Sequence, residues 1–102
     1  MVMVKHIVVW KLKAEAHGQP AAENARAIKA KLEALQGRIP GLLKIEVGID
    51  FGQSDSSCDL ALYSELESRA ALDGYQAHPE HKAVMPFIAD ARSERRVVDY
   101  EV

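Results

Sequence analysis

The first stretch of the chain, "VMVKHIVVWKLK" at residues 2–13, constrains the fold more than any other feature. It is rich in Val and Ile and alternates with a period of two, which predicts a β-strand. One face of this strand carries Val4, His6, Val8, Trp10 and Leu12. The other face has Ile7 and Val9 at its centre, where a solvated strand would be polar. A strand that is apolar on both faces needs cover on both sides, so one layer of helices is not enough.

The size and charge of the chain limit the classes of protein to which it can belong. Its 102 residues predict a single domain over 1–102, and 48% hydrophobic residues can build a core. A domain this small leaves much of its surface exposed, so a partner subunit would stabilise it by burying part of that surface. Lys and Arg number 13 against 15 Asp and Glu, a formal net charge of −2, which lacks the basic excess of a nucleic-acid binder. We also expect no membrane partner, because the apolar start is too short to span a bilayer and is interrupted by Lys5 and His6.

Cysteine usage and the missing motifs limit the chemistry. Cys58 is the one cysteine, so an intrachain disulfide is impossible and a reducing, cytoplasmic setting fits best. A lone cysteine in a strand-like run is expected to be a small buried hydrophobe. The sequence has no glycine-rich phosphate loop, nucleophile elbow or dinucleotide fingerprint, and we expect no cofactor.

An amphipathic helix is predicted over residues 20–36. Pro20 suits its first turn and Gly37 its C-terminal cap. The apolar residues at helical spacing are Ala22, Ala25, Ile28, Leu32 and Leu35. The preceding "AEAHGQP" reads as a loop, in which His17 is expected to be solvated.

Three further strands are predicted. After a turn at Pro40-Gly41, apolar residues alternate with polar or small ones at Ile45, Val47, Ile49 and Phe51. "GQSDSS" then predicts a hairpin loop, which leads into the strand "CDLALYSEL". The closing "ERRVVDYEV" predicts the last strand.

The segment between the last two strands is predicted to form separate short helical segments. Ser68 is expected to cap a short helix, which should break at His78 because Pro79 disfavours helical geometry there. Pro79 can open another helical turn with His78 as its cap, and Pro86 is expected to interrupt the helical run "HKAVMPFIADA".

The order strand, helix, strand, strand, helix, strand predicts an α+β, ferredoxin-like βαββαβ fold. Its four-stranded antiparallel sheet would carry helices on one face. The other face would be bare in a monomer, yet the first strand is apolar on both faces. We therefore expect a homodimer through the sheet face, in which two sheets form a dimeric α+β barrel.

The segment "YQAHPEHKAV" suggests a site, because it holds His78 and His81. Two histidines three residues apart can share a helix face, but the proline between them breaks the helix. Zinc usually takes three or four protein ligands, and the obvious additions, Cys58 and His6, lie on separate strands. We expect no dedicated metal site. Acid–base chemistry is the sharper hypothesis, since histidine titrates near neutrality and a tyrosine hydroxyl can stabilise a developing enolate.

Four segments together resemble the stress-responsive A/B barrel (Dabb) family. They are "VKHIVVWKLK", "IPGLLKIEVGIDF", "YQAHPEH" and "RRVVDYEV", in this order over essentially the whole chain. The resemblance implies a ferredoxin-like protomer that dimerises into an α+β barrel. It does not imply one activity, since the family includes stress-induced proteins of unassigned function and cofactor-free polyketide cyclases, and the superfamily includes cofactor-independent monooxygenases.

The resemblance also implies candidate catalytic residues. In cyclase-like members the second histidine of the "HPxH" motif is the base and a preceding tyrosine assists, which here are His81 and Tyr75. A histidine of the first strand lines the same pocket and corresponds to His6. Such an enzyme would act on a small carbonyl compound without a cofactor. The alternative is a non-catalytic dimer, with or without a small ligand, in which these side chains only satisfy a helix junction and a core.

Three further side chains have predicted roles. Trp10 is expected in the core. A strand carboxylate can orient a histidine or pair across the sheet with Arg95 or Arg96, and we expect the surface pair for Asp99. For Asp59 both roles stay open.

Overall fold

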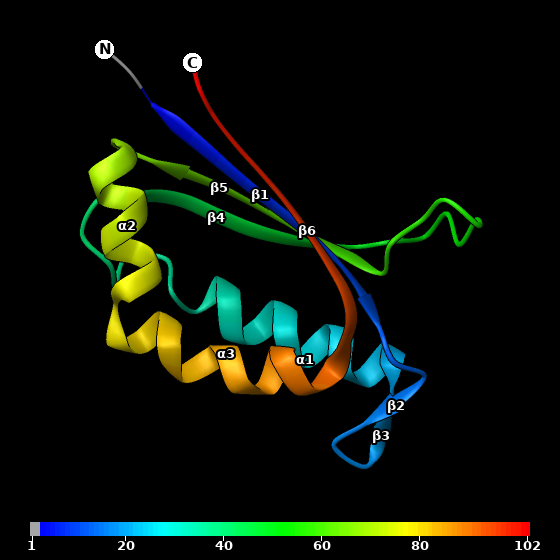
Figure 1. The fold of residues 1–102 in the computed structure, drawn as a ribbon. Helices are drawn as coiled ribbons and strands as arrows, with labels where there is room; N and C mark the ends of the chain where they lie inside the picture. Colours follow the sequence, from blue (N-terminus) through cyan, green and yellow to red (C-terminus); the bar gives the residue numbers. More distant parts are fainter. Residues whose placement is uncertain (1–2) are drawn as a thin grey trace.

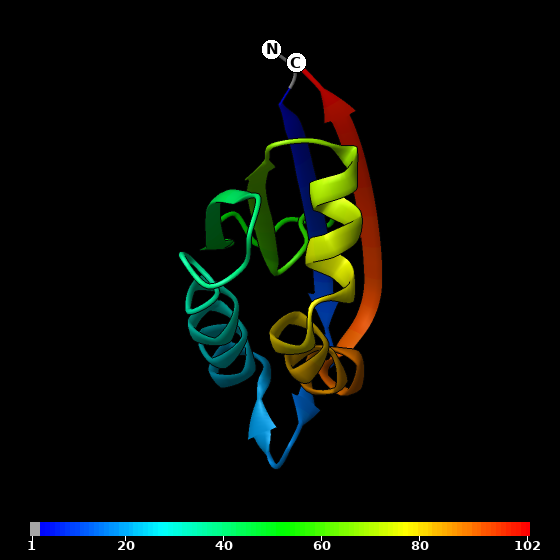
Figure 2. The same ribbon diagram turned by 90° about the vertical axis from the view of Figure 1, so that its left-hand side faces the viewer.

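The computed structural model describes residues 3–102 as a two-layer α+β fold (Figure 1). The main sheet is antiparallel, with the order β4-β5-β1-β6, and consists of β1 (Val4–Leu12), β4 (Leu42–Ile49), β5 (Leu60–Leu66) and β6 (Arg92–Glu101). The helices α1 (Ala21–Glu33), α2 (Arg69–Ala77) and α3 (Pro79–Ala91) all cover the same face of this sheet (Figures 1 and 2). The predicted ferredoxin-like fold is thus confirmed.

The core lies between the sheet and the helices. The alternation of β1 turns Val4, His6, Val8, Trp10 and Leu12 toward it, and all five are buried. Helix α1 contributes Ile28 and Leu32, which are fully buried. Burying an aliphatic side chain of this size contributes about 1.5–3 kcal/mol relative to leaving it exposed. The predicted apolar face of the first strand therefore forms the centre of the core.

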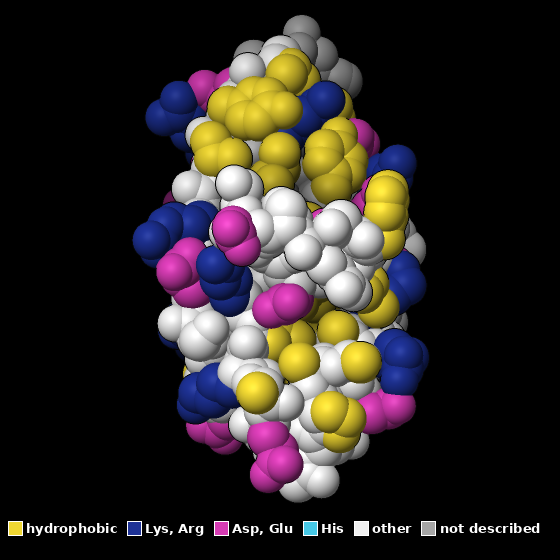
Figure 3. All heavy atoms as spheres, turned by 90° about the vertical axis from the view of Figure 1, so that its right-hand side faces the viewer, with side chains coloured by type: hydrophobic (Ala, Val, Ile, Leu, Met, Phe, Trp, Pro, Cys, Tyr) yellow, Lys and Arg dark blue, Asp and Glu magenta, His cyan; other side chains and the backbone are white. Residues whose placement is uncertain are grey.

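No helix of residues 3–102 covers the other face of the sheet. Ile7 lies there between Tyr63 of β5 and Val98 of β6, because directly opposed residues of antiparallel strands share a face. We call this surface the sheet-face patch, and it comprises Ile7, Val9, Ala61, Tyr63, Val98 and Tyr100. Figure 3 shows hydrophobic side chains gathered on the upper half of the corresponding side of the molecule. Both apolar faces predicted for the first strand are therefore present, and the helices of the described chain cover one of them.

Several local features confirm the predicted turns and caps. The Ser68 side chain accepts a hydrogen bond from the Ala71 N–H and caps α2. Gly41 turns the chain after Pro40 with a φ of +82°. A Cβ at this glycine would lie 2.7 Å from the Ala71 Cβ, so the turn requires glycine for space as well as for its backbone angle.

The loop predicted before the first helix contains a small hairpin instead. It pairs β2 (Glu15–Ala16) with β3 (Gln19–Pro20) through a turn at His17 and Gly18, whose φ values are +55° and +70°. The His17 ring stacks on Phe87 with 4.0 Å between ring centroids, and its Nε2–H donates to the Phe87 carbonyl at 3.0 Å. His17 is exposed to solvent as predicted, and the hairpin folds back onto α3 so that the ring also contacts that helix.

Helix boundaries differ from the predictions at two places. Helix α1 starts after Pro20, which is its N-cap, and ends at Glu33, so the segment from 34 to 36 forms turns. Helix α3 runs through Pro86 without interruption. A proline at this position leaves the carbonyl of Lys82 without its usual helical donor. Lys82 is exposed, while Ile88 and Ala91 beyond the proline are buried, so packing of the last turns keeps the helix intact.

Strand ends also differ. Strand β4 stops at Ile49, and Phe51, which we predicted on its apolar face, is 97% exposed. Cys58 precedes β5 and is half-buried, so it is not the buried strand residue that we expected. Strand β6 begins at Arg92, two residues before the predicted start. In the part of the chain from residue 3 to residue 102, no helix has the length and apolar character needed to cross a membrane.

Candidate functional site

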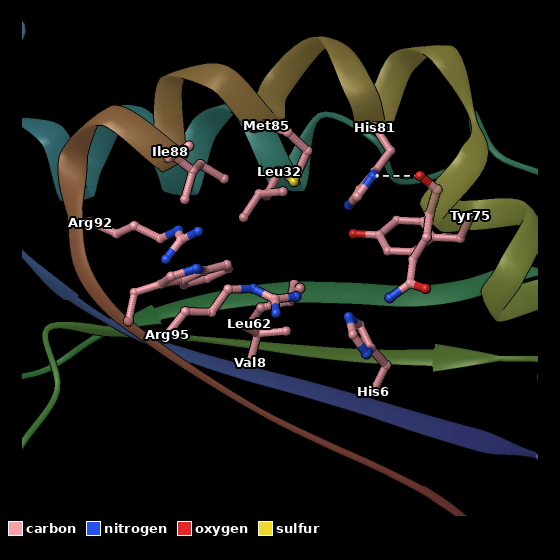
Figure 4. A pocket seen from close by; sticks show the side chains of 13 residues that line it. His6, Val8, Leu32, Leu62, Tyr75, His81, Met85, Ile88, Arg92 and Arg95 are labelled. Atoms are coloured by element: carbon pink, nitrogen blue, oxygen red, sulfur yellow. Dashed lines mark hydrogen bonds between the residues drawn. The ribbon is translucent and has the colours of Figure 1, made fainter.

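A cavity of about 260 Å³ lies between the sheet and the helices α2 and α3. We call it the helix-side cavity (Figure 4). It is lined by His6, Val8, Trp10, Leu32, Leu62, Tyr75, Gln76, His81, Met85, Ile88, Ala89, Arg92 and Arg95. Its size is close to the lower end of the range for ligand pockets, so it would fit only a small molecule.

His6 reaches this cavity from the central strand. Its side chain is 2% exposed, and its Nδ1–H donates to the carboxylate of Asp99, the residue directly opposite on β6. This bond leaves Nε2 on the cavity side of the ring (Figure 4). The expected surface pair of Asp99 with Arg95 or Arg96 is therefore wrong. Arg96 lies on the other face of β6, and Arg95 is four residues away, about 13 Å along an extended strand.

Tyr75 projects from α2 into the same space. It is fully buried, with its ring centroid 6.1 Å from that of His6 and 4.4 Å from that of His81. Its hydroxyl has no hydrogen-bond partner among residues 3–102. Burial raises the pKa of Tyr75 to about 12, because the phenolate form would lose its hydration. At neutral pH the hydroxyl is therefore protonated and able to donate.

His81 occupies the first turn of α3 because His78 starts that helix. The Nδ1 of His78 accepts a hydrogen bond from the Glu80 N–H at 3.1 Å, which confirms the predicted cap. The Nδ1–H of His81 donates to the Gln76 carbonyl at 3.3 Å, so its proton-free Nε2 turns toward the cavity (Figure 4). Burial lowers the pKa of His81 below its usual value. The nearby His6, Arg95 and His78 lower it further, although the bond to Gln76 opposes them.

The three residues that the sequence suggested as a pocket thus line one cavity. His6 comes from β1, Tyr75 from α2 and His81 from α3. His78 serves the helix junction and does not line the cavity. Their role in catalysis stays a prediction. The arrangement combines a donor at Tyr75 with an acceptor nitrogen at His81, which can bind a carbonyl oxygen and take up a proton beside it.

Other lining residues were not identified as such from the sequence. The strand alternation of β6 places Arg95 on the same face as Asp99, so it could have been found from the period of two. Arg92 could not have been found in this way, because its position depends on the residue at which α3 ends. Trp10 is buried as predicted but also lines the cavity, and its indole Nε1–H has no partner among residues 3–102.

The remaining candidate side chains lie outside this cavity. The Asp59 carboxylate accepts the backbone N–H of Leu12 at 2.6 Å and so secures the end of β1. Cys58 lines a separate pocket with Ile49 and Asp50, at the end of β4. In the described part of the chain, no three His, Cys, Asp or Glu side chains are grouped so that they could hold a metal ion.

Solved structures with the same fold cover nearly the whole chain. A dimeric protein of unknown function from Bacteroides fragilis is 35% identical over 98% of this chain and 96% of its own, with a TM-score of 0.84. A dimeric ferredoxin-like protein of unknown function from Thermobifida fusca is 23% identical over 99% and 92%, with a TM-score of 0.85. Hydroxynitrile lyase from Passiflora edulis is 21% identical over 98% and 93%, with a TM-score of 0.81, and shares the fold.

Sequence comparison identifies the family more directly than these structures do. No curated protein matches the sequence. The stress responsive A/B barrel domain, in contrast, matches residues 4–102, which is nearly the full length. The chain therefore belongs to the stress responsive A/B barrel domain (Dabb) family.

Proposed function

We propose that this protein is a homodimer that binds a small carbonyl compound in the helix-side cavity of each protomer. The observation that carries the ligand proposal is the buried Tyr75 hydroxyl, which lines the cavity and has no partner among residues 3–102. An unpaired buried polar group costs about 1–3 kcal/mol. A ligand carbonyl oxygen at this hydroxyl would remove that cost, so the site favours a ligand with such an acceptor.

The ligand proposal is tested by thermal shift on the wild type beside His81→Ala. A ligand bound in the cavity should raise the melting temperature of the wild type, because it binds the folded state only. The same compound should give little or no shift with His81→Ala, since it loses a contact in the cavity. The matched control is Lys82→Ala, an exposed neighbour on the same helix that does not line the cavity. Equal shifts in all three proteins across a broad set of small carbonyl compounds would contradict the proposal.

A second candidate function is cofactor-independent proton transfer, and the hydrogen bond of His81 favours it. Because Nδ1–H donates to the Gln76 carbonyl, Nε2 is the basic nitrogen of the neutral ring. Nε2 would take the proton from a carbon next to the ligand carbonyl as the C–H bond breaks. The electron pair would move onto the carbonyl oxygen, where the Tyr75 O–H would stabilise the enolate. The shared fold of hydroxynitrile lyase is compatible with such a role, although at 21% identity only the fold carries over.

This second function predicts a specific pH dependence. The pKa of His81 is lowered from 6.5, so the neutral, basic form prevails at neutral pH. Exchange of the α-hydrogens of a small ketone for deuterium should therefore accelerate as pH rises, with a midpoint below 6.5, and level off above it. His81→Gln should reduce the catalysed rate by about a hundredfold or more, the usual contribution of a positioned base. A profile that is unchanged in His81→Gln would exclude His81 as the base.

The dimer proposal rests on the sheet-face patch. Its apolar residues form a contiguous stripe over three strands that no helix of residues 3–102 covers. Contiguous exposed apolar surface of this kind marks interaction sites. The two neighbours from Bacteroides fragilis and Thermobifida fusca are described as dimeric, which supports the same assembly here. We infer that two copies pack their sheets face to face around a two-fold axis.

A further inference from the structure

We propose that the ligand carries a carboxylate, which Arg92 and Arg95 bind in the helix-side cavity at a distance from His81 and Tyr75. This inference rests on the proposed binding function and adds the chemical class of the ligand. It makes the ligand an oxo acid, in which a short apolar chain separates an anionic end from a carbonyl group.

Arg92 and Arg95 differ from all other arginines in the described chain. Within residues 3–102, every other arginine has a carboxylate within 4 Å: the pairs are Arg26–Glu23, Arg38–Glu80, Arg69–Glu101 and Arg96–Glu94. Arg92 and Arg95 have no such partner among these residues, and both line the cavity. Figure 4 shows their guanidinium groups turned toward the cavity interior, with Arg92 farthest from His81. Two positive charges that have no carboxylate partner in the described chain therefore line the same cavity.

The surroundings of the two guanidinium groups favour an anion. Val8, Leu62 and Ile88 supply apolar walls, and charge pairs are stronger where such walls exclude water. The indole N–H of Trp10 adds a third donor without a partner in the described chain, and Trp10 lies directly opposite Arg95 in the sheet. The planar guanidinium fork matches the two oxygens of a carboxylate.

The position of Arg92 distinguishes a carboxylate from a phosphate. Arg92 directly follows the C-terminus of α3, where the helix dipole places partial negative charge. This negative charge opposes a dianion more strongly than a monoanion. The small volume, about 260 Å³, also favours the smaller group. Arg95 is exposed, so it lies where the cavity meets solvent and can attract an entering anion.

The strand register determines how the two ends of the ligand are spaced. Trp10 and Arg95 are paired across β1 and β6, and His6 and Asp99 are paired four residues farther along. Four residues of extended strand span roughly 13 Å. The long arginine side chains shorten that distance within the cavity. A carboxylate at the arginines therefore leaves the far end of a short chain beside Tyr75 and His81.

The experiment compares levulinate and its longer oxo-acid homologues with their methyl esters, which keep the carbonyl and lose the charge. Binding to the full-length protein is measured by calorimetry. We expect at least one acid to bind more tightly than its ester, and the acid's affinity to fall with added salt. Arg92→Gln and Arg95→Gln should each weaken binding of that acid by roughly ten- to hundredfold, the usual value of a hydrogen bond to a charged group, and leave the ester unchanged. The control Arg96→Gln removes a guanidinium from the other face of β6 and should bind acid and ester like the wild type.

Each of the following four outcomes would overturn the inference. If acid and ester bind equally, the cavity binds carbonyl compounds without an anion subsite, and the proposed function survives. If no oxo acid binds, the inference fails, while the comparison of wild type with His81→Ala still tests the function independently. If inorganic phosphate displaces the acid at equal concentration, the assignment to a carboxylate is wrong. If Arg96→Gln weakens binding as much as Arg95→Gln does, the effect comes from net charge and no arginine subsite exists.

Discussion

Replacing Val98 with glutamate is expected to convert the homodimer into a monomer. Val98 is 52% exposed in the protomer and lies on the sheet-face patch, opposite Ile7 of the central strand. In a dimer with packed sheets, the new carboxylate would be buried next to apolar side chains, and burial of an unpaired charge costs several kcal/mol. We therefore expect the dimer to weaken by at least about a hundredfold. Sedimentation equilibrium should report about 11.3 kDa, the mass of one chain, in place of twice that value.

The neighbouring valine provides a matched control. Val97 is 40% exposed, but it pairs with the buried Val8 and thus lies on the helix side of β6. Val97→Glu introduces the same charge one residue away on the opposite face, and the dimer should persist. If both variants dissociate, or if the wild type already sediments as a single chain, then the sheet face is not the interface.

Tyr75→Phe is expected to make the protein more stable and its ligand binding weaker. The Tyr75 hydroxyl is buried without a partner in the described chain, so its removal abolishes a cost of about 1–3 kcal/mol without opening a large cavity. The same hydroxyl is the proposed donor to the ligand carbonyl, and its loss should weaken binding by about tenfold. Thermal unfolding without ligand measures the stability, and calorimetry with the compound found in the His81 comparison measures the affinity.

Tyr63→Phe is the control for this prediction. Tyr63 donates a hydrogen bond to Glu65 at 2.5 Å on the other face of the sheet, so its hydroxyl is satisfied. Its removal should not raise the melting temperature and should leave ligand binding intact. If Tyr75→Phe lowers stability and keeps the affinity, then the hydroxyl is an ordinary part of the core and the ligand does not contact it.

Most of the fold could be predicted because it depends on local patterns. The period of two in the strands and the caps at Ser68 and His78 reflect interactions between near neighbours in the chain. The errors occurred where distant contacts override local preference. Helix α3 continues through Pro86 because buried residues beyond it hold the last turns, and the loop predicted before α1 forms a hairpin that folds onto α3.

The candidate site was predictable only in part. His6, Tyr75 and His81 came from a family resemblance and from residue chemistry, and they do line one cavity. The partner of His6 could not be inferred, because Asp99 lies opposite it only through the register of β1 and β6. Nor could the pattern of charges in the sequence show which of the six arginines have no carboxylate partner in the described part of the chain, since ion pairs such as Arg38–Glu80 join residues far apart in the sequence.

A family resemblance pointed to the histidines and the tyrosine that face the cavity, and the sequence by itself determined the class of fold and the doubly apolar central strand. These depend on backbone periodicity, on proline and cap chemistry, and on side-chain type, all of which are properties of short segments. Only the tertiary structure decided which groups have no partner among residues 3–102: the hydroxyl of Tyr75, the indole of Trp10 and the guanidinium groups of Arg92 and Arg95. Whether a polar group is satisfied depends on strand register and helix docking, and these arise from the packing of the whole core.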